Sequence, residues 1–224
     1  MLNWAARYFP IVRALKQRLC PGDQILEIGA GPFGIGKFLR VPFVGCDLKF
    51  PSRPSAPMLP VAASATQLPF RDRSFDAVIL SDVLEHIPPV HRMCVVREGL
   101  RVARKVAVFG FPSGVKAFEY DLKLAQAYER GGYPRPDWLE EHMRYQPFPT
   151  KELFSELPEG WSASSFENEH VAFHNWVMKQ EAHRSALYGF QLLVALAPRF
   201  TEFLLRRADR APFYRQIVVV ARTT

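Results

Sequence analysis

The chain has 224 residues, of which 48% are hydrophobic and 23% are charged, a composition typical of a globular domain and not of a disordered segment. No uninterrupted apolar run reaches the roughly 18 residues of a membrane-spanning helix, and no secretory signal is apparent at the N-terminus. The three cysteines are widely spaced, which argues against a disulfide framework or a zinc site and favours a reducing cytoplasm. The net charge of +7 allows nucleic acid, anionic membrane or phosphorylated partners.

Strand-like and helix-like segments alternate through the first half of the chain. Trp4, Tyr8 and Leu15 recur at helical spacing, which predicts an N-terminal helix within residues 1–22. A proline-rich stretch, Lys49–Pro60, is predicted to be an extended loop. The predicted strands cover residues 24–28, 42–47, 61–65, 75–80 and 105–111, and the predicted helices cover residues 35–39 and 89–102.

The second half predicts two insertions into the same domain. Residues 114–149 contain a helix over 116–130 and then a segment rich in glycine, proline and aromatic residues. Residues 169–214 separate the last two predicted strands, 161–166 and 216–222, and include an apolar helix or helix pair broken at Pro198. A short helix over 151–157 is predicted to be capped by Thr150. Residues 1–224 are thus expected to form one doubly wound α/β domain, which binds ligands beyond the carboxyl ends of its strands.

A glycine-rich turn follows the first predicted strand, in the sequence I-L-E-I-G-A-G-P-F-G-I-G. Glycines there let the backbone approach a ligand, and the following helix offers unpaired N–H groups. Dinucleotide-binding enzymes use similar turns, so the glycines alone do not identify the ligand. Glu27 distinguishes between these possible ligands, because a carboxylate at the strand tip suits an amine-bearing ligand better than a pyrophosphate.

The motif around Glu27-Ile28-Gly29-Ala30-Gly31 resembles the first motif of class I S-adenosylmethionine-dependent methyltransferases. Asp47 matches the acidic residue that in this family holds the ribose hydroxyls, and the run L-P-F…S-F-D…L-E-H over Leu68–His86 resembles the small-molecule branch of the family. The resemblance implies a mostly parallel seven-stranded sheet of class I methyltransferase type and S-adenosylmethionine as the cofactor. The implied cofactor-binding residues are Glu27, Gly29, Ala30, Gly31, Phe33, Asp47, Leu48, Ser64, Ala65 and Ser81.

Two positions depart from the family pattern. Phe33 stands where a further glycine is expected, with Gly34 displaced by one residue. Ser64 stands where the family often has an aspartate that faces the adenine amino group. These departures leave open a binding module that keeps the fold without catalysis. An NAD-type oxidoreductase is a further alternative, which Glu27 and the irregular glycine spacing disfavour.

The segment after the fourth strand carries Asp82, Glu85 and His86, which would share one face of a helix. In some quinone-type O-methyltransferases that resemble this chain, such residues are implicated in a divalent metal site. Two oxygen ligands and one histidine are few for such an ion, and Asp82 with Glu85 would also make a capping box, so we predict no metal. His86 is the candidate general base.

The acceptor is predicted to be a small molecule, a sugar or a lipid precursor, methylated on a hydroxyl oxygen. The N-P-P-Y sequence of amino-group methyltransferases is absent, as is a catalytic cysteine pair. An RNA acceptor is suggested only by charge, without an added RNA-binding module, and is disfavoured. Candidate acceptor contacts are Tyr120, His142, Tyr145 and His170. Residues 185–210 combine an apolar stretch with arginines, which suits an anionic membrane surface, a buried helix or a dimer contact; the oligomeric state is left open.

Overall fold

A computed structural model of the chain describes residues 1–50, 57–181 and 184–223. Seven strands form one sheet in the order β3-β2-β1-β4-β5-β7-β6. Strands β1 to β5 pair in parallel, and β7 runs antiparallel to both β5 and β6. This arrangement confirms the predicted mostly parallel seven-stranded sheet. The strands are β1 (Ile25–Ile28), β2 (Phe43–Asp47), β3 (Met58–Ala62), β4 (Phe75–Ser81), β5 (Ala103–Pro112), β6 (Trp161–His170) and β7 (Phe213–Arg222).

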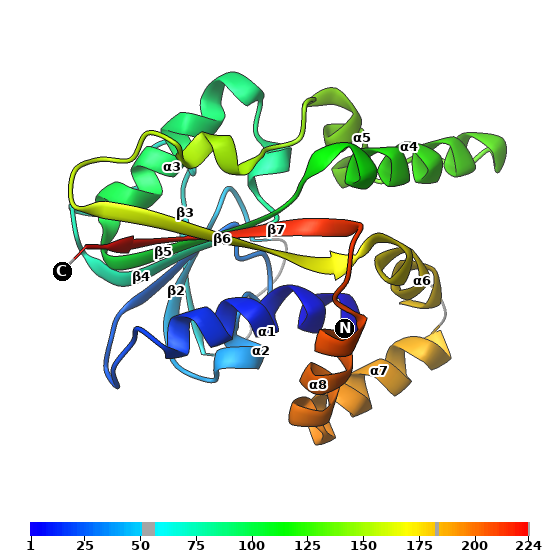
Figure 1. The fold of residues 1–224 in the computed structure, drawn as a ribbon, viewed down its shortest axis with the longest axis horizontal. Coiled ribbons are helices and arrows are strands. Elements are labelled where there is room, and N and C mark those ends of the chain that lie inside the picture. The colour runs from blue at the N-terminus through cyan, green and yellow to red at the C-terminus, as the bar shows by residue number, and fades with distance from the viewer. Residues whose placement is uncertain (51–56, 182–183, 224) are drawn as a thin grey trace.

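Helices cover both faces of the sheet (Figure 1). Helix α1 (Leu2–Lys16) and the short α2 (Gly36–Leu39) lie on one face, and α3 (Pro89–Val102) lies on the other. Every residue of β4 is buried, because its alternate side chains enter different cores. Ala77 and Ile79 pack with α1, whereas Val78 and Leu80 pack with α3.

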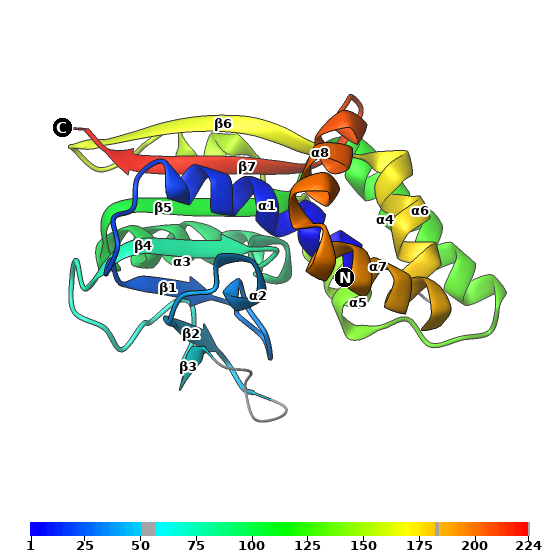
Figure 2. The same cartoon turned by 90° about the horizontal axis from the view of Figure 1, so that it is seen from below.

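Five further helices gather at the end of the sheet where the parallel strands finish (Figure 2). They are α4 (Gly114–Arg130), α5 (Asp137–Arg144), α6 (Val171–Glu181), α7 (Arg184–Leu196) and α8 (Pro198–Ala208). Helices α4 and α5 belong to the first predicted insertion, and α6 to α8 belong to the second. The break before Pro198 separates α7 from α8, as expected of a residue that lacks a backbone N–H.

Several local predictions differ from the structure. Helix α5 forms within the glycine- and proline-rich segment that predicted none, and Thr150 makes no capping bond to the short 3₁₀ turn η2 (Lys151–Phe154). Strand β3 begins three residues earlier than predicted, because it pairs with β2 from Phe43 opposite Met58 onward. It tolerates Pro60 as the edge strand of the sheet. Residues 51–56 of the predicted loop lie outside the described part of the chain.

Candidate functional site

The glycine turn after β1 has two crowded glycines and one open glycine. Gly29 has φ +73°, and a Cβ there would lie 2.3 Å from Cγ2 of Val83. Gly34 has φ +50°, and a Cβ there would lie 2.4 Å from Oε2 of Glu27. Gly31 has φ +55° but no atom within 4 Å of the Cβ position. The first two positions therefore need glycine for packing, while Gly31 leaves space above the turn.

Glu27 lies fully buried beneath this turn. Its Oε1 accepts a hydrogen bond from the Tyr8 hydroxyl at 2.7 Å, and its Oε2 accepts one from the Ile35 N–H at 2.6 Å. Burial raises the pKa of Glu27 to about 7, against the opposing effect of these two hydrogen bonds. Glu27 thus anchors the turn to α1 and to the start of α2, and its direct contact with the cofactor stays a prediction.

Asp47 ends β2 beside the glycine turn. Its Oδ2 accepts a hydrogen bond from the Gly31 N–H at 2.9 Å, and its Oδ1 accepts one from the Leu48 N–H at 2.8 Å. Each carboxylate oxygen can accept further hydrogen bonds, so a partly exposed Asp47 can still take two vicinal hydroxyls. Leu48 is 74% exposed and flanks this position.

The other candidate cofactor residues follow the neighbouring strands. Ser64 and Ala65 are partly buried after β3, and the Ser64 Oγ lies 2.8 Å from the Thr66 hydroxyl. Ser81 ends β4, and its buried hydroxyl has no hydrogen-bond partner. Ala30 is buried in the turn itself. These residues therefore lie along one sheet edge, with a free polar atom and open space above Gly31.

Phe33 forms a partly exposed wall of the turn. Its ring packs edge-on against Trp4 of α1 at 5.9 Å, and the Lys37 Nζ lies 4.2 Å from its centroid. The side chain is 39% exposed. The residue that departs from the glycine pattern therefore joins the turn to the N-terminal helix.

A polar cavity of about 260 Å³ opens beyond the ends of β4 and β5. It draws on segments that are far apart in the sequence. Its walls come from α1, the turn after β4, α5, α6 and the start of β7. The lining residues are Asn3, Arg7, Asp82, Glu85, His86, Pro112, Trp138, His142, His174, Met178, Tyr214 and Arg215.

A buried network of charges forms one side of this cavity. Arg215 binds both oxygens of Asp82, at 2.8 and 2.7 Å, and also pairs with Glu169. Arg7 pairs with Asp82 at 2.8 Å, and Glu169 lies 3.0 Å from Nδ1 of His174. Although burial raises it, the pKa of Asp82 is held well below its usual range by the Arg215 and Arg7 guanidinium groups. The network joins α1, β4, β6, α6 and β7.

The backbone at Asp82 is left-handed, with φ +53°. Only a short 3₁₀ turn, η1 (Leu84–His86), follows it. The predicted helical face and capping role of Asp82 are therefore wrong, because Arg215 and Arg7 bind its carboxylate.

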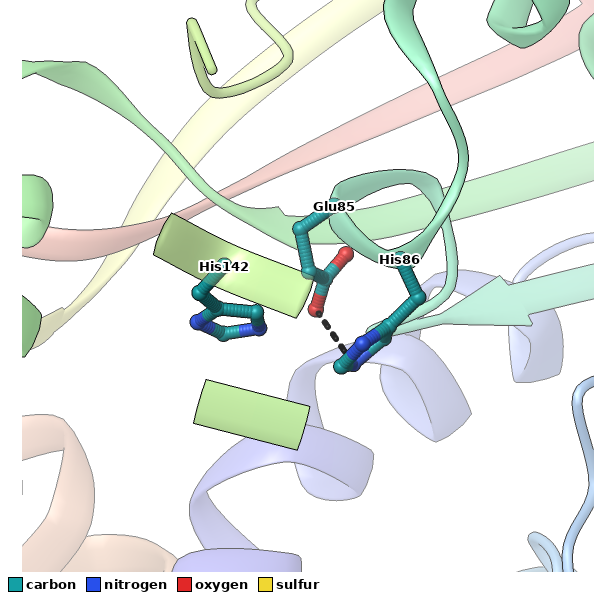
Figure 3. Close-up of side chains that lie close together, drawn as sticks. All are labelled: Glu85, His86 and His142. Atoms are coloured by element: carbon teal, nitrogen blue, oxygen red, sulfur yellow. Dashed lines mark ion pairs between the residues drawn. The ribbon is translucent and has the colours of Figure 1, made fainter. Parts of the chain in front are cut away.

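Glu85, His86 and His142 meet at another side of the cavity (Figure 3). The His86 Nδ1 lies 2.7 Å from a Glu141 oxygen, and the His142 Nδ1 lies 2.7 Å from an Asp121 oxygen. The His86 Nε2 lies 3.9 Å from Oε1 of Glu85. Within residues 1–50, 57–181 and 184–223, the buried Glu85 Oε2 and His142 Nε2 have no hydrogen-bond partner.

Comparison with known proteins identifies the fold and its family. Residues 26–110 match the family described as "Methyltransferase domain". The matched stretch is less than half of the chain. The match spans the glycine turn, Asp47 and the turn after β4, so the predicted family, and with it the predicted cofactor S-adenosylmethionine, are confirmed.

Individual relatives share only low sequence identity with this chain. A Bos taurus protein named "Probable tRNA methyltransferase 9B" is 32% identical over 111 residues, which are 43% of this chain but only 22% of that protein's length. A "Putative methyltransferase from antibiotic biosynthesis pathway" of Anabaena variabilis superposes with a TM-score of 0.56 at 17% identity, covering 98% of this chain and all of that one. Magnesium protoporphyrin IX methyltransferase of Synechocystis PCC 6803, solved with bound SAH, gives a TM-score of 0.52 at 12% identity, covering 99% and 84%. These structures establish a shared fold.

Only some of the residues predicted to contact the acceptor line the cavity. His86 and His142 line the cavity. Tyr120 is buried behind the wall, edge-on to His174 at 5.6 Å, and its hydroxyl has no partner. Tyr145 and His170 are not among the lining residues, and the His170 Nδ1 accepts a hydrogen bond from the Ala172 N–H instead.

Sequence reasoning missed several residues of the cavity and of the charge network beside it. Arg7, Arg215 and Glu169 were not candidates, because an isolated arginine or glutamate in a helix or strand carries no local signal. The one available hint was Arg215, a charged residue two positions before the apolar run of β7. Glu85 and His142 were each noted in the sequence, but their meeting could not be predicted because they lie in different segments.

Proposed function

We propose that this protein transfers a methyl group from S-adenosylmethionine to a hydroxyl oxygen of a small molecule held in the polar cavity. The cavity's position carries the proposal, because it opens directly beyond β4, next to the strand that bears the glycine turn. S-adenosylmethionine supplies a methyl group that is already electrophilic. The protein's task is then to align the acceptor oxygen with that methyl group and to exclude water.

His86 supports a hydroxyl acceptor. A carboxylate can only accept a hydrogen bond, so the Nδ1 of His86 donates its proton to Glu141 and leaves Nε2 as the basic nitrogen. Burial, reinforced by the neighbouring His142, lowers the pKa of His86 and keeps the ring neutral. As the O–CH3 bond forms and the S–CH3 bond breaks, the hydroxyl proton can pass to this nitrogen.

The cavity's lining suits a small polar acceptor, such as a sugar or a lipid precursor. Trp138 and Tyr214 provide aromatic surfaces on which a ring can stack. Arg7 and Arg215 are engaged by acidic partners and so do not call for an anionic acceptor. A volume of about 260 Å³ admits a single ring or a short chain.

Calorimetry and a methyl-transfer assay test this proposal. Wild-type protein should bind S-adenosylmethionine and S-adenosylhomocysteine at sub-millimolar concentration and should not bind NAD. Labelled methyl groups should then appear on hydroxyl compounds in a mixed panel of phenols, sugars and amines. Binding of NAD alone would reject the proposal in favour of an oxidoreductase. Tight binding of the sulfur ligands with no transfer to any acceptor would favour a non-catalytic binding module.

A tRNA acceptor is the second candidate, favoured by the name of the 32%-identical relative and by the net charge of +7. The same assay with bulk tRNA separates the two. Methyl incorporation into tRNA that falls steeply with rising salt would support the tRNA acceptor. Incorporation only into the small-molecule panel would support the first proposal.

We further propose that α7 and α8 dock on an anionic membrane surface. None of the helices in the described part of the chain has the length and apolar character needed to cross a bilayer. Helix α7 instead exposes Tyr188, Leu192 and Leu196 on one face. Helix α8 exposes Phe200 and Phe203 in the same way.

Arginines border these exposed rings and aliphatic chains. Arg199, Arg206 and Arg207 are exposed on α8, and Arg207 lies 5.1 Å from the centre of the Phe203 ring. Apolar groups flanked by cations match the interface of an anionic membrane better than they match a second copy of the same cationic face.

Vesicle co-sedimentation tests the membrane surface. Wild-type protein should sediment with phosphatidylserine vesicles and much less with phosphatidylcholine vesicles. The double variant Leu192→Glu/Leu196→Glu should lose binding, whereas Val90→Glu, which alters an 82%-exposed residue of α3, should keep it. Failure of the wild type to bind either vesicle would reject the proposal. A wild-type dimer that Leu192→Glu/Leu196→Glu dissociates would instead identify a contact between copies.

A further inference from the structure

Glu85, His86 and His142 each offer one ligand atom, and these atoms lie within 4.8 Å of one another. Figure 3 shows the Glu85 carboxylate and the His86 ring turned toward each other, with the His142 ring alongside. We propose that these three residues bind one divalent transition-metal ion of the zinc or iron(II) class. The first two come from the turn after β4 and the third comes from α5, so the site exists only in the folded protein.

Both imidazoles are already oriented as metal ligands usually are. A metal-binding histidine normally donates its other ring N–H to a carboxylate, which fixes the ring and raises its basicity. Here Nδ1 of His86 is held by Glu141 and Nδ1 of His142 is held by Asp121, both at 2.7 Å. Each ring therefore presents Nε2, without its proton, on the side of the cluster.

The cluster also contains buried polar atoms that lack a partner. Glu85 is 1% exposed, and neither its Oε2 nor the buried Nε2 of His142 has a hydrogen-bond partner among the residues that the structure describes. A buried carboxylate and a buried ring nitrogen without partners are costly. The guanidinium groups of Arg7 and Arg215 bind the Asp82 carboxylate instead of Glu85. A cation bound between the three residues would satisfy both atoms.

Arg92 holds the two halves of the cluster together. It is buried, and it donates hydrogen bonds to the carbonyl oxygens of Leu84 and Ile87 on one side and of Tyr145 and Pro147 on the other. These carbonyls flank the turn that carries Glu85 and the end of the helix that carries His142. The side chain therefore sets the separation between the ligands from the two segments.

The ligand types indicate the class of ion. Two imidazoles and one carboxylate suit zinc or iron(II), and three protein ligands leave positions open for a substrate. Ligand atoms about 2.1 Å from a shared ion lie roughly 3 to 3.5 Å from one another, so small side-chain rotations would close the present spacing. Asp82 is not a ligand here, because Arg215 and Arg7 occupy its oxygens.

The inference rests on the proposed methyl transfer and deepens it. An acceptor hydroxyl bound to the ion would release its proton to water, and the resulting oxygen anion would attack the methyl group while the S–CH3 bond breaks. His86 would then act as a ligand and not as the proton acceptor. A hydroxyl that chelates the ion, such as one beside a second oxygen, would be the preferred acceptor class.

Metal titration of the untagged, chelator-treated protein tests the site directly. Wild-type protein should bind one Zn²⁺ per chain in calorimetry. With Co²⁺ it should develop a visible absorption band that indicates nitrogen and oxygen ligands. His142→Ala and His86→Gln should each weaken Zn²⁺ binding at least about 100-fold and should remove the band. Asp121→Asn, which alters the partner of His142 Nδ1 and of the Tyr214 hydroxyl, should weaken binding about 10- to 100-fold.

A histidine outside the cluster supplies the matched control. His91→Ala, an exposed position on α3, should bind Zn²⁺ as the wild type does. Thermal melting and S-adenosylhomocysteine affinity, both measured without metal, should be unchanged in His86→Gln and so show that this variant is folded. Wild-type protein that binds S-adenosylhomocysteine but no Zn²⁺ below about 100 µM would overturn the metal site and leave the methyltransferase proposal standing. Zn²⁺ binding that survives in both His142→Ala and His86→Gln would also overturn it.

Discussion

The predicted cofactor side and the proposed acceptor side of this methyltransferase domain share one sheet edge but are assembled differently. On the cofactor side, the Gly31 N–H binds Asp47, only 16 residues away. On the acceptor side, Asp82 and Arg215 meet across 133 residues of sequence. The first side is a local motif that the sequence displays directly. The second is made by packing α1, α5, α6 and β7 around the turn after β4, so it depends on the whole fold.

The strongest test of this contrast is Arg215→Met, which removes the centre of the buried charge network. Asp82 keeps Arg7, but Glu169 loses its guanidinium partner while remaining buried. Loss of one partner from such a network costs about 3–5 kcal/mol. Urea denaturation should show this loss of unfolding free energy. A change below about 1 kcal/mol would mean that the network contributes little to holding the acceptor side together.

Gly29→Ala should cause the next largest loss of unfolding free energy, because it adds a side chain where the glycine turn is crowded. The new Cβ would lie 2.3 Å from Val83, and the residue would keep φ +73°. Overpacking together with a left-handed backbone costs about 2–4 kcal/mol in urea denaturation. Gly31→Ala is the control, since no atom lies within 4 Å of its Cβ position. It should cost only about 1–2 kcal/mol, from the backbone alone. Equal losses would show that packing does not distinguish the two glycines.

Glu27→Gln removes the titratable carboxyl group that anchors the glycine turn. The pKa of Glu27 is about 7 in the folded protein, against an ordinary value of 4.5. The folded state therefore retains a proton that the unfolded chain releases, and Glu27 lowers stability as pH rises from 4.5 through 7. The difference in unfolding free energy between Glu27→Gln and wild type should shift in favour of the variant by about 3 kcal/mol between pH 4.5 and 8. A pH-independent difference would contradict this.

Asp47→Ala should have the smallest effect on stability and a clear effect on ligand binding. Loss of hydrogen bonds to the ribose hydroxyls should weaken S-adenosylhomocysteine about 30-fold, or roughly 2 kcal/mol. An analogue without the 2′-hydroxyl provides the control, because it should bind wild type more weakly but should bind the variant almost as S-adenosylhomocysteine does. Unchanged affinity of Asp47→Ala in calorimetry would reject the ribose role.

The outcome of the sequence predictions follows the same division. The run of strands was predictable because β4 contains the apolar run Ala77–Leu80 and the turn glycines follow β1 directly. Helix α5 was missed because its eight residues lie between glycine- and proline-rich segments. Asp82 was misassigned because helical spacing suggested a shared face with Glu85, whereas its partners come from α1 and β7.

By itself, the sequence determined the alternation of strands and helices and the resemblance to methyltransferases, because these depend on short-range periodicity and on residues close together in the chain. Only the tertiary structure decided what Glu27, Asp82 and His142 do. Their roles depend on partners from other elements: Tyr8 of α1, Arg215 of β7 and Asp121 of α4. The physical reason is that burial makes an unpaired charge or polar group costly, so each of these side chains is defined by the group that folding brings to it.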